Sequence, residues 1–112
     1  MRKDDKIRLS HMLFAAREAQ AFVRNETVAS IVKDRKLILA LVKAAEIIGE
    51  AASKASAECQ KDLRQIPWRN IIGMRNRLIH AYFDVNLDIL WKTITEDLDP
   101  LISELENTLE SV

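Results

Sequence analysis

The stretch "LILALVKAAEIIGEAASKA", residues 37–55, decides the fold class because its apolar residues recur at alternating spacings of four and three. With about 3.6 residues per turn, such spacings place apolar side chains on one face of an α-helix. The stripe consists of Leu37, Leu41, Ala44, Ile48, Ala51 and Ala55. A helix with one apolar face has to bury that face against other elements, so the stretch predicts a long amphipathic helix within a larger core.

Helical periodicity also covers the chain before this stretch. An amphipathic first helix is expected over about residues 3–24, where the apolar spacing is the same. The residues "NET" at 25–27 predict the end of the first helix and a new N-cap. Thr27 is expected to start a short helix that ends near Asp34. After the long helix, Ser56 is expected to cap a turn within residues 53–59.

Two prolines and an asparagine divide the second half of the chain. Pro67 fits the first turn of a helix, so a third helix is expected to begin around residues 66–68 and to run to about residue 83. Asn86 is the candidate N-cap of a last helix, in which Pro100 predicts a kink or restart near Asp99. No strand-like alternation is apparent. The chain therefore predicts a single all-α domain over residues 1–112, an up-and-down bundle of four main helices with short helical segments.

The composition limits the cellular compartment that is expected and the kinds of metal site that the chain can form. Cys59 is the single cysteine and cannot form an internal disulfide, which favours a reducing cytoplasm. The apolar runs are too short to span a membrane, and the N-terminus lacks the apolar core of a signal peptide. A cage of Cys and His ligands for a metal is nearly excluded by one Cys and two His, although carboxylate sites stay possible. No cofactor is expected.

The net charge of zero hides a strong asymmetry along the chain. Residues 84–112 hold eight acidic residues and one basic residue, whereas the segment 61–80 is basic. The basic residues of this segment are Lys61, Arg64, Arg69, Arg75 and Arg77, against Asp62. Such a cluster either binds an anion locally or forms an ordinary solvated helix face, and composition leaves both interpretations open.

The stretch "MRNRLIHAYF", residues 74–83, concentrates chemically versatile side chains in the expected third helix. Histidine exchanges protons near neutral pH, and arginine offers a fixed fork of donors suited to phosphate oxygens. His80 with Arg75 therefore fits metal-free phosphodiester cleavage, which needs a base for the ribose 2′-OH and a cation for the charged transition state. Asn76 and Gly73 share the expected helix face with His80. The glycine marks a close approach either of another helix or of a ligand, and His80 could also be an ordinary packing histidine.

One copy of this site is chemically incomplete, because cleavage also needs a general acid for the leaving 5′-oxygen. His11 lies on a different helix and has no local partners. A two-fold homodimer would bring two copies of His80 to one seam. On a straight helix Arg75 and His80 would also point about 140° apart, which again favours a site at an interface.

At this point the residues match a known family pattern. Arg75, four residues, His80, one residue and Tyr82 form R-x4-H-x-Y. Together with "AAEIIGEAA" at 44–52, "IPWRNIIGMRNRLIHAYFDVNLDILW" at 66–91 and "EDLDPL" at 96–101, the motif resembles the HepT-like toxins of the HEPN-domain ribonuclease superfamily. The resemblance covers about the last two-thirds of the chain and makes it similar to the toxins of prokaryotic type VII toxin–antitoxin pairs.

The resemblance implies a helical homodimer that acts as a metal-independent RNA endonuclease. Arg75 and His80 of both protomers would line the seam with support from Asn76, and we expect Arg69 and Arg77 to contribute to RNA binding. The implied partner is a minimal nucleotidyltransferase antitoxin that adds AMP to Tyr82. The alternative interpretation of Tyr82 is an ordinary aromatic residue of the core.

Two other functions stay open on the sequence. The chain could be a non-catalytic nucleotide- or substrate-binding companion subunit of a nucleotidyltransferase, or a helical dimer with structural duties only. Glu46 and Glu50 lie within the family-like segment, yet the sequence gives them no chemical role beyond a helix face or support of the motif.

Overall fold

Four long helical stretches run along the molecule in the computed structural model, which describes residues 1–81 and 84–111. Two of them are the single helices α1 (Lys3–Phe22) and α3 (Arg35–Lys54). The others are the broken pair α5 (Trp68–Ile72) and α6 (Met74–Leu78), and the continuous run of α7 (Leu87–Lys92), the π-helical turn η1 (Thr93–Asp97) and α8 (Leu98–Glu110). The shorter elements are α2 (Val28–Val32), α4 (Ala57–Asp62) and the strands β1 (Ile79–Ala81) and β2 (Asp84–Val85). The predicted all-α bundle is thus confirmed, while the dimer stays a prediction.

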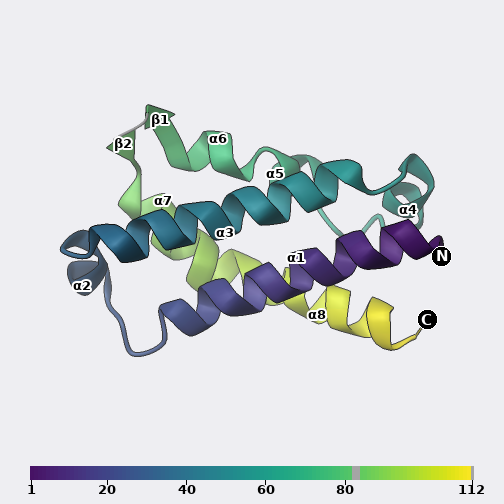
Figure 1. Ribbon diagram of the computed structural model, residues 1–112, viewed down its shortest axis with the longest axis horizontal. Coiled ribbons are helices and arrows are strands. Elements are labelled where there is room, and N and C mark those ends of the chain that lie inside the picture. The colour runs from purple at the N-terminus through teal and green to yellow at the C-terminus, as the bar shows by residue number, and fades with distance from the viewer. Residues whose placement is uncertain (82–83, 112) are drawn as a thin grey trace.

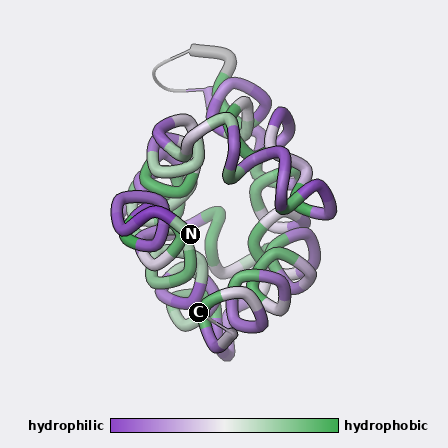
Figure 2. The backbone as a smooth tube through the Cα atoms, turned by 90° about the vertical axis from the view of Figure 1, so that its right-hand side faces the viewer, coloured by the Kyte–Doolittle hydropathy of each residue, from purple (hydrophilic) through white to green (hydrophobic). Residues whose placement is uncertain are grey.

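Helix α3 lies between α1 on one side and α5 and α6 on the other (Figure 1). Helix α8 packs against α1, so the four stretches surround a shared interior, and apolar segments recur along each coil (Figure 2). The largest fully buried side chains are Leu9, Met12, Ile31, Leu41, Ile48, Ile66, Met74, Leu78, Leu90, Ile94, Leu98 and Leu105. Burying a side chain of this size stabilises the fold by about 1.5–3 kcal/mol, and this core fixes α6 on α3. Among the described residues, none of the helices has the length and apolar character needed to cross a membrane.

The expected caps form, and they explain where the helices begin. Thr27 Oγ1 accepts a hydrogen bond from Ser30 N at 3.1 Å, and Ser30 Oγ accepts one in return from Thr27 N at 2.8 Å. Ser56 Oγ accepts from Cys59 N at 3.1 Å, and Asn86 Oδ1 accepts from Ile89 N at 3.0 Å. Each bond satisfies a backbone donor that the first turn of a helix leaves unpaired.

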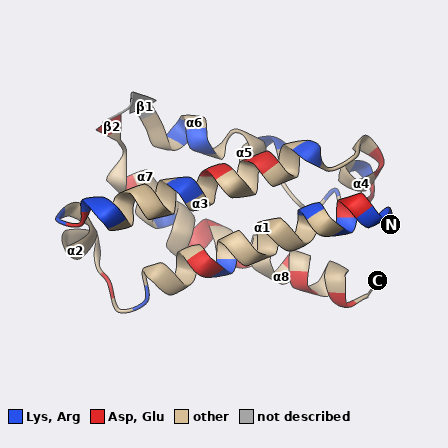
Figure 3. Cartoon of the chain, in the orientation of Figure 1, with Lys and Arg blue, Asp and Glu red and all other residues tan. Residues whose placement is uncertain are grey.

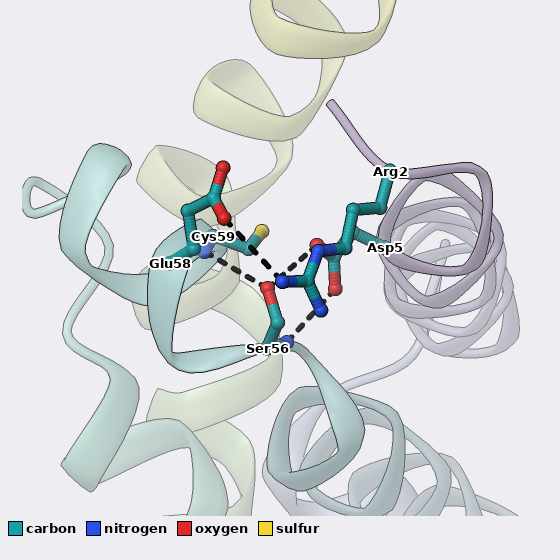
Figure 4. A network of polar contacts seen from close by, with 5 residues as sticks. All are labelled: Arg2, Asp5, Ser56, Glu58 and Cys59. Carbon is teal, nitrogen blue, oxygen red and sulfur yellow. Dashed lines mark hydrogen bonds and ion pairs between the residues drawn. The ribbon is translucent and has the colours of Figure 1, made fainter.

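Asp5 ties the start of α1 to the turn between α3 and α4 (Figure 4). Asp5 as a residue is 4% exposed, and its carboxylate accepts hydrogen bonds from Ser56 N at 2.8 Å and from Ser56 Oγ at 2.7 Å. Burial acts to raise the pKa of Asp5, but the two bonds from Ser56 and the charge of Arg2 outweigh it and leave the pKa below its ordinary value. Burial raises the pKa of the neighbouring Cys59 thiol, which disfavours the reactive thiolate.

The third helix differs from the prediction. It breaks at Gly73 and ends at Leu78, and residues 79–81 form β1, which pairs antiparallel with β2. The carbonyl of Leu78 accepts a hydrogen bond from Asn86 N at 2.8 Å rather than from its own helix. Asn86 also caps α7, so the backbone that follows Leu78 is paired as an antiparallel ladder of β1 with β2 rather than within a helix. The expectations of a helix to about residue 83 and of no strand were wrong.

The last helix restarts close to where Pro100 predicted it. Proline has no N–H for the helical ladder, and the π-helical turn η1 lies immediately before α8, in which Pro100 is the third residue. Gln20 Nε2 of α1 donates to the carbonyl of Ile94 at 3.2 Å, which compensates a backbone group of this turn. The expected restart near Asp99 is confirmed.

Candidate active site

A groove of about 520 Å³ crosses the outer face of α3 and brings together residues from four helices, α1, α3, α5 and α6. Arg75 and Asn76 line it from α6, and Arg8 and His11 line it from α1. Between them lie α3 side chains, with Glu46 at the Arg75 end. We call this cavity the α3 groove. Its volume is in the range of small-ligand sites, and it holds two of the predicted site residues, Arg75 and Asn76.

Glu46 holds Arg75 in the α3 groove. Arg75 Nε donates to Glu46 Oε1 at 2.8 Å, and the Lys43 ammonium lies 3.8 Å from Glu46 Oε2. The Arg75 side chain is 48% exposed, so the ion pair stabilises the fold by only about 0–1 kcal/mol. Its consequence is orientation, because a guanidinium anchored through Nε keeps its two terminal nitrogens for an anion in the groove.

Gly49 lets α3 approach α5 closely enough to form this pair. A Cβ at Gly49 would lie 3.2 Å from the carbonyl oxygens of both Ile71 and Ile72. At Gly73 a Cβ would meet the Arg69 carbonyl oxygen, one turn earlier in the same segment, at 3.3 Å. The close approach of another element therefore occurs at Gly49, and Gly73 lies at the junction of α5 and α6. Among the described residues, a Cβ at Gly73 would meet no helix other than the adjoining α5 within 4 Å, and the close approach of a ligand to Gly73 stays a prediction.

His80 lies in β1 rather than on the helix of Arg75 and Asn76. The expected helix face shared by Asn76 and His80, and the 140° separation of Arg75 and His80, therefore do not apply. The backbone of His80 follows the end of α6 by two residues, so the motif joins a helix and a strand. Tyr82 lies outside the described residues, and its expected role stays a prediction.

The structure does not bring Arg77 and Arg69 into the α3 groove. Arg77 lines a second cavity of about 630 Å³, together with acidic residues of η1 and α8. Its Nη1 donates to the carbonyl of Asn70 at 2.9 Å. Arg69 is exposed on α5. Figure 3 shows basic residues along α6 and acidic residues along α8, and carboxylates of both η1 and α8 share the second cavity with Arg77. RNA binding by Arg69 and Arg77 stays a prediction.

Sequence reasoning left Glu46 as either a helix face or support of the motif, and its ion pair with Arg75 fits the second interpretation. It missed Gly49 and His11 as residues of the groove. Glu46 and Gly49 share the segment "EIIGEA", in which a glycine interrupts a strongly apolar helix, and that interruption was the available signal. His11 was set aside because its partners come from other helices, whereas it lines the groove with Arg75. Within the described residues, no three His, Cys, Asp or Glu side chains lie close enough to hold a metal ion.

Comparison with known proteins places the chain in a family. The family described as "Ribonuclease HepT-like" matches residues 12–108. A protein of Thermococcus cleftensis named "Probable ribonuclease HepT" is 35% identical over 95% of this chain and 96% of its own. A protein of Caldanaerobacter subterraneus named "Putative RNase TTE0752" is 35% identical over 91% of both chains. No solved structure gives a significant match. The chain belongs to the HepT-like ribonuclease family.

Proposed function

We propose that the protein is a metal-independent RNA endonuclease whose cutting site contains Arg75, Asn76 and His80. The observation that carries the proposal is the Arg75–Glu46 ion pair, which holds the Arg75 side chain in the α3 groove. Arg75 belongs to α6, and β1, the strand that contains His80, follows α6 directly. The names of the relatives support RNA as the substrate. No metal is required in this scheme, because the imidazole supplies proton transfer and the guanidinium supplies charge.

The reaction is a transfer of the phosphodiester within the RNA. His80 takes the proton of the ribose 2′-OH, the 2′-oxygen attacks phosphorus, and the bond to the 5′-oxygen breaks. The products are a 2′,3′-cyclic phosphate and a 5′-hydroxyl. Arg75 stabilises the extra negative charge of the transition state, and Asn76 donates a hydrogen bond in support.

The protonation of the leaving 5′-oxygen is assigned to the His80 of a second protomer. A two-fold interface repeats the same patch, so two copies of His80 meet at one seam. Light scattering checks the dimer: a protein that stays monomeric at micromolar concentration removes the second proton carrier from the scheme.

The protein acts as the toxin of a toxin–antitoxin pair in this proposal, and a minimal nucleotidyltransferase neutralises it. The partner transfers AMP from ATP to the hydroxyl of Tyr82 and releases pyrophosphate. The added phosphate, two residues from His80, repels RNA. Mass spectrometry after incubation with such a partner and ATP tests this step, and an unmodified Tyr82 contradicts it.

RNA cleavage in the presence of a chelator tests the proposal as a whole. The wild-type protein is expected to cut RNA without added metal, and His80→Ala is expected to lose at least about 100-fold in rate, as expected for removal of a general acid–base group. Circular dichroism controls for the fold. Tight nucleotide binding with no cleavage of several RNAs would instead favour the companion-subunit function.

A further inference from the structure

The side of the α3 groove opposite Arg75 carries two side chains without an assigned role. Arg8 and His11 lie three residues apart on α1, a spacing that puts them on one helix face, and both line the groove. Within residues 1–81 and 84–111, neither makes an ion pair or a side-chain hydrogen bond. We call these two residues the α1 bank.

The charges of the α3 groove favour an anionic ligand. Its cationic residues are Arg8, Lys43, Lys54 and Arg75. The two carboxylates that line it, Glu46 and Glu50, already pair with cations of α3 and α6. In the described part of the chain, Arg8 is thus the cation of this groove that has no carboxylate partner.

The two sides of the groove are separated by the width of α3. Helix α3 contacts α1 on one side and α6 on the other (Figure 1), and a helix with its side chains is about 10 Å across. An extended chain with several phosphates can contact Arg75 on one side of α3 and Arg8 on the other at the same time. The groove also exposes the apolar side chains of Ile47 and Ile72, which are 38% and 40% exposed and offer a surface for ribose and base.

We propose that the α1 bank binds the RNA strand next to the nucleotide that is cut, an inference that rests on the proposed ribonuclease function. Arg8 donates to phosphate oxygens of the neighbouring nucleotide. His11 supplies an imidazole face on which an unpaired base stacks. The groove then aligns a single strand across α3, with its scissile phosphate at Arg75.

Binding and cleavage measurements on matched RNAs test the α1 bank. Binding is followed by fluorescence anisotropy at several salt concentrations, with a single-stranded RNA that carries 2′-O-methyl groups and so cannot be cut. Cleavage is measured on an unmodified RNA of the same sequence and on a dinucleotide, which has one phosphate. The proteins are the wild type, Arg8→Ala, Arg8→Lys, His11→Ala and the control Arg24→Ala, which removes an exposed arginine beyond the far end of α1.

Arg8→Ala is expected to reduce the slope of log affinity against log salt by about 0.7, the value for one lost phosphate contact on a single strand. It should raise KM for the long RNA and leave KM for the dinucleotide unchanged, while Arg8→Lys keeps the slope. His11→Ala should weaken binding about fivefold or more at every salt concentration, as expected for lost stacking. Arg24→Ala should behave as the wild type.

The results separate this inference from the proposed function. If the wild type cuts RNA but Arg8→Ala and His11→Ala keep its KM and its salt slope, RNA binding by the α1 bank is contradicted and the proposed ribonuclease activity is retained. If the wild type cuts no RNA, yet Arg8→Ala still reduces the slope of log affinity against log salt for the 2′-O-methyl RNA, the ribonuclease activity is contradicted and RNA binding by the α1 bank is retained.

Discussion

Arg75 and Arg77 are two residues apart and have different surroundings. Arg75 is anchored by Glu46 in the α3 groove, and Arg77 donates to the carbonyl of Asn70 beside the second cavity. Successive positions of a helix face different directions, so a cluster of arginines in the sequence does not make one cluster in space. Of the two, Arg75 lies in the cavity that further cations line, which supports the role proposed for it above.

Glu46 is therefore expected to act as a positioning residue for Arg75. The variant Glu46→Gln keeps the side-chain shape and removes the charge, so it should lower kcat for RNA cleavage about tenfold, a loss typical of one weakened charge-assisted bond. The unfolding free energy should change by less than about 1 kcal/mol, because the pair is half-exposed. Steady-state kinetics and denaturant unfolding measure the two effects.

The matched control is Glu106→Gln, which removes the carboxylate of another interhelical pair, that of Glu106 with Arg17. This pair joins α1 and α8 away from the α3 groove, and cleavage should be unaffected. Equal kinetic losses in the two variants would show that Glu46 acts through general stability rather than through Arg75.

At the scale of elements, the contact of α3 with α5 depends on Gly49. The variant Gly49→Ala places a Cβ against two backbone carbonyl oxygens that have little freedom to move. Alanine favours a helix by about 1 kcal/mol over glycine, and overpacking costs about 1–3 kcal/mol, so the expected net result is a loss of stability. Cleavage should fall as well, because α5 and α6 carry Arg75 away from Glu46.

Gly73→Ala provides the comparison on the other glycine. Its Cβ would meet a single carbonyl oxygen at 3.3 Å, and its backbone has a negative φ, so its unfolding free energy should lie closer to that of the wild type. Thermal and denaturant unfolding of both variants measure the difference. A Gly49→Ala protein that is more stable than Gly73→Ala would contradict the close packing of α3 on α5.

The elements that could be predicted are those that local chemistry determines. The apolar stripe of α3, the caps Thr27, Ser56 and Asn86, and the restart at Pro100 all rest on residues a few positions apart. The end of α6 at Leu78 could not be predicted this way, since it depends on a hydrogen bond from Asn86 across the reversal.

The same reason limits what the sequence says of the site. Arg75 and Asn76 could be selected from residue chemistry and from the motif. The partner of Arg75 is 29 positions away on α3, and His11 reaches the same groove from α1. Spacing along one helix contains no information on which helices become neighbours, so the pairing of Glu46 with Arg75 and the position of His11 in the groove could not be predicted.

At the scale of the whole molecule, Asp5 links the N-terminal helix to the far end of α3. Its pKa is lower in the folded protein than in the unfolded chain, so the unfolded state binds a proton more readily. The stabilisation by Asp5 is therefore fully present above the unfolded value of about 3.9 and is lost as the pH falls through the lower folded value.

Asp5→Asn is expected to lower the unfolding free energy at pH 7 by about 1–3 kcal/mol, because a charged acceptor of two buried bonds is lost. It should also flatten the decline of stability in acid, since the variant has no carboxylate to protonate at this site. Urea unfolding across the acidic range measures both effects. A variant whose stability declines in acid as steeply as that of the wild type would contradict this role of Asp5.

The whole molecule is proposed to work as a dimer that cuts RNA without metal, and the chemistry of the cut ends tests this claim most directly. The measurement is mass spectrometry of the fragments that the wild type and His80→Ala release from one RNA in the presence of a chelator. The account predicts 2′,3′-cyclic phosphate and 5′-hydroxyl ends from the wild type and no fragments above background from His80→Ala. Fragments with 5′-phosphate ends, or equal cleavage by the folded His80→Ala protein, would contradict it.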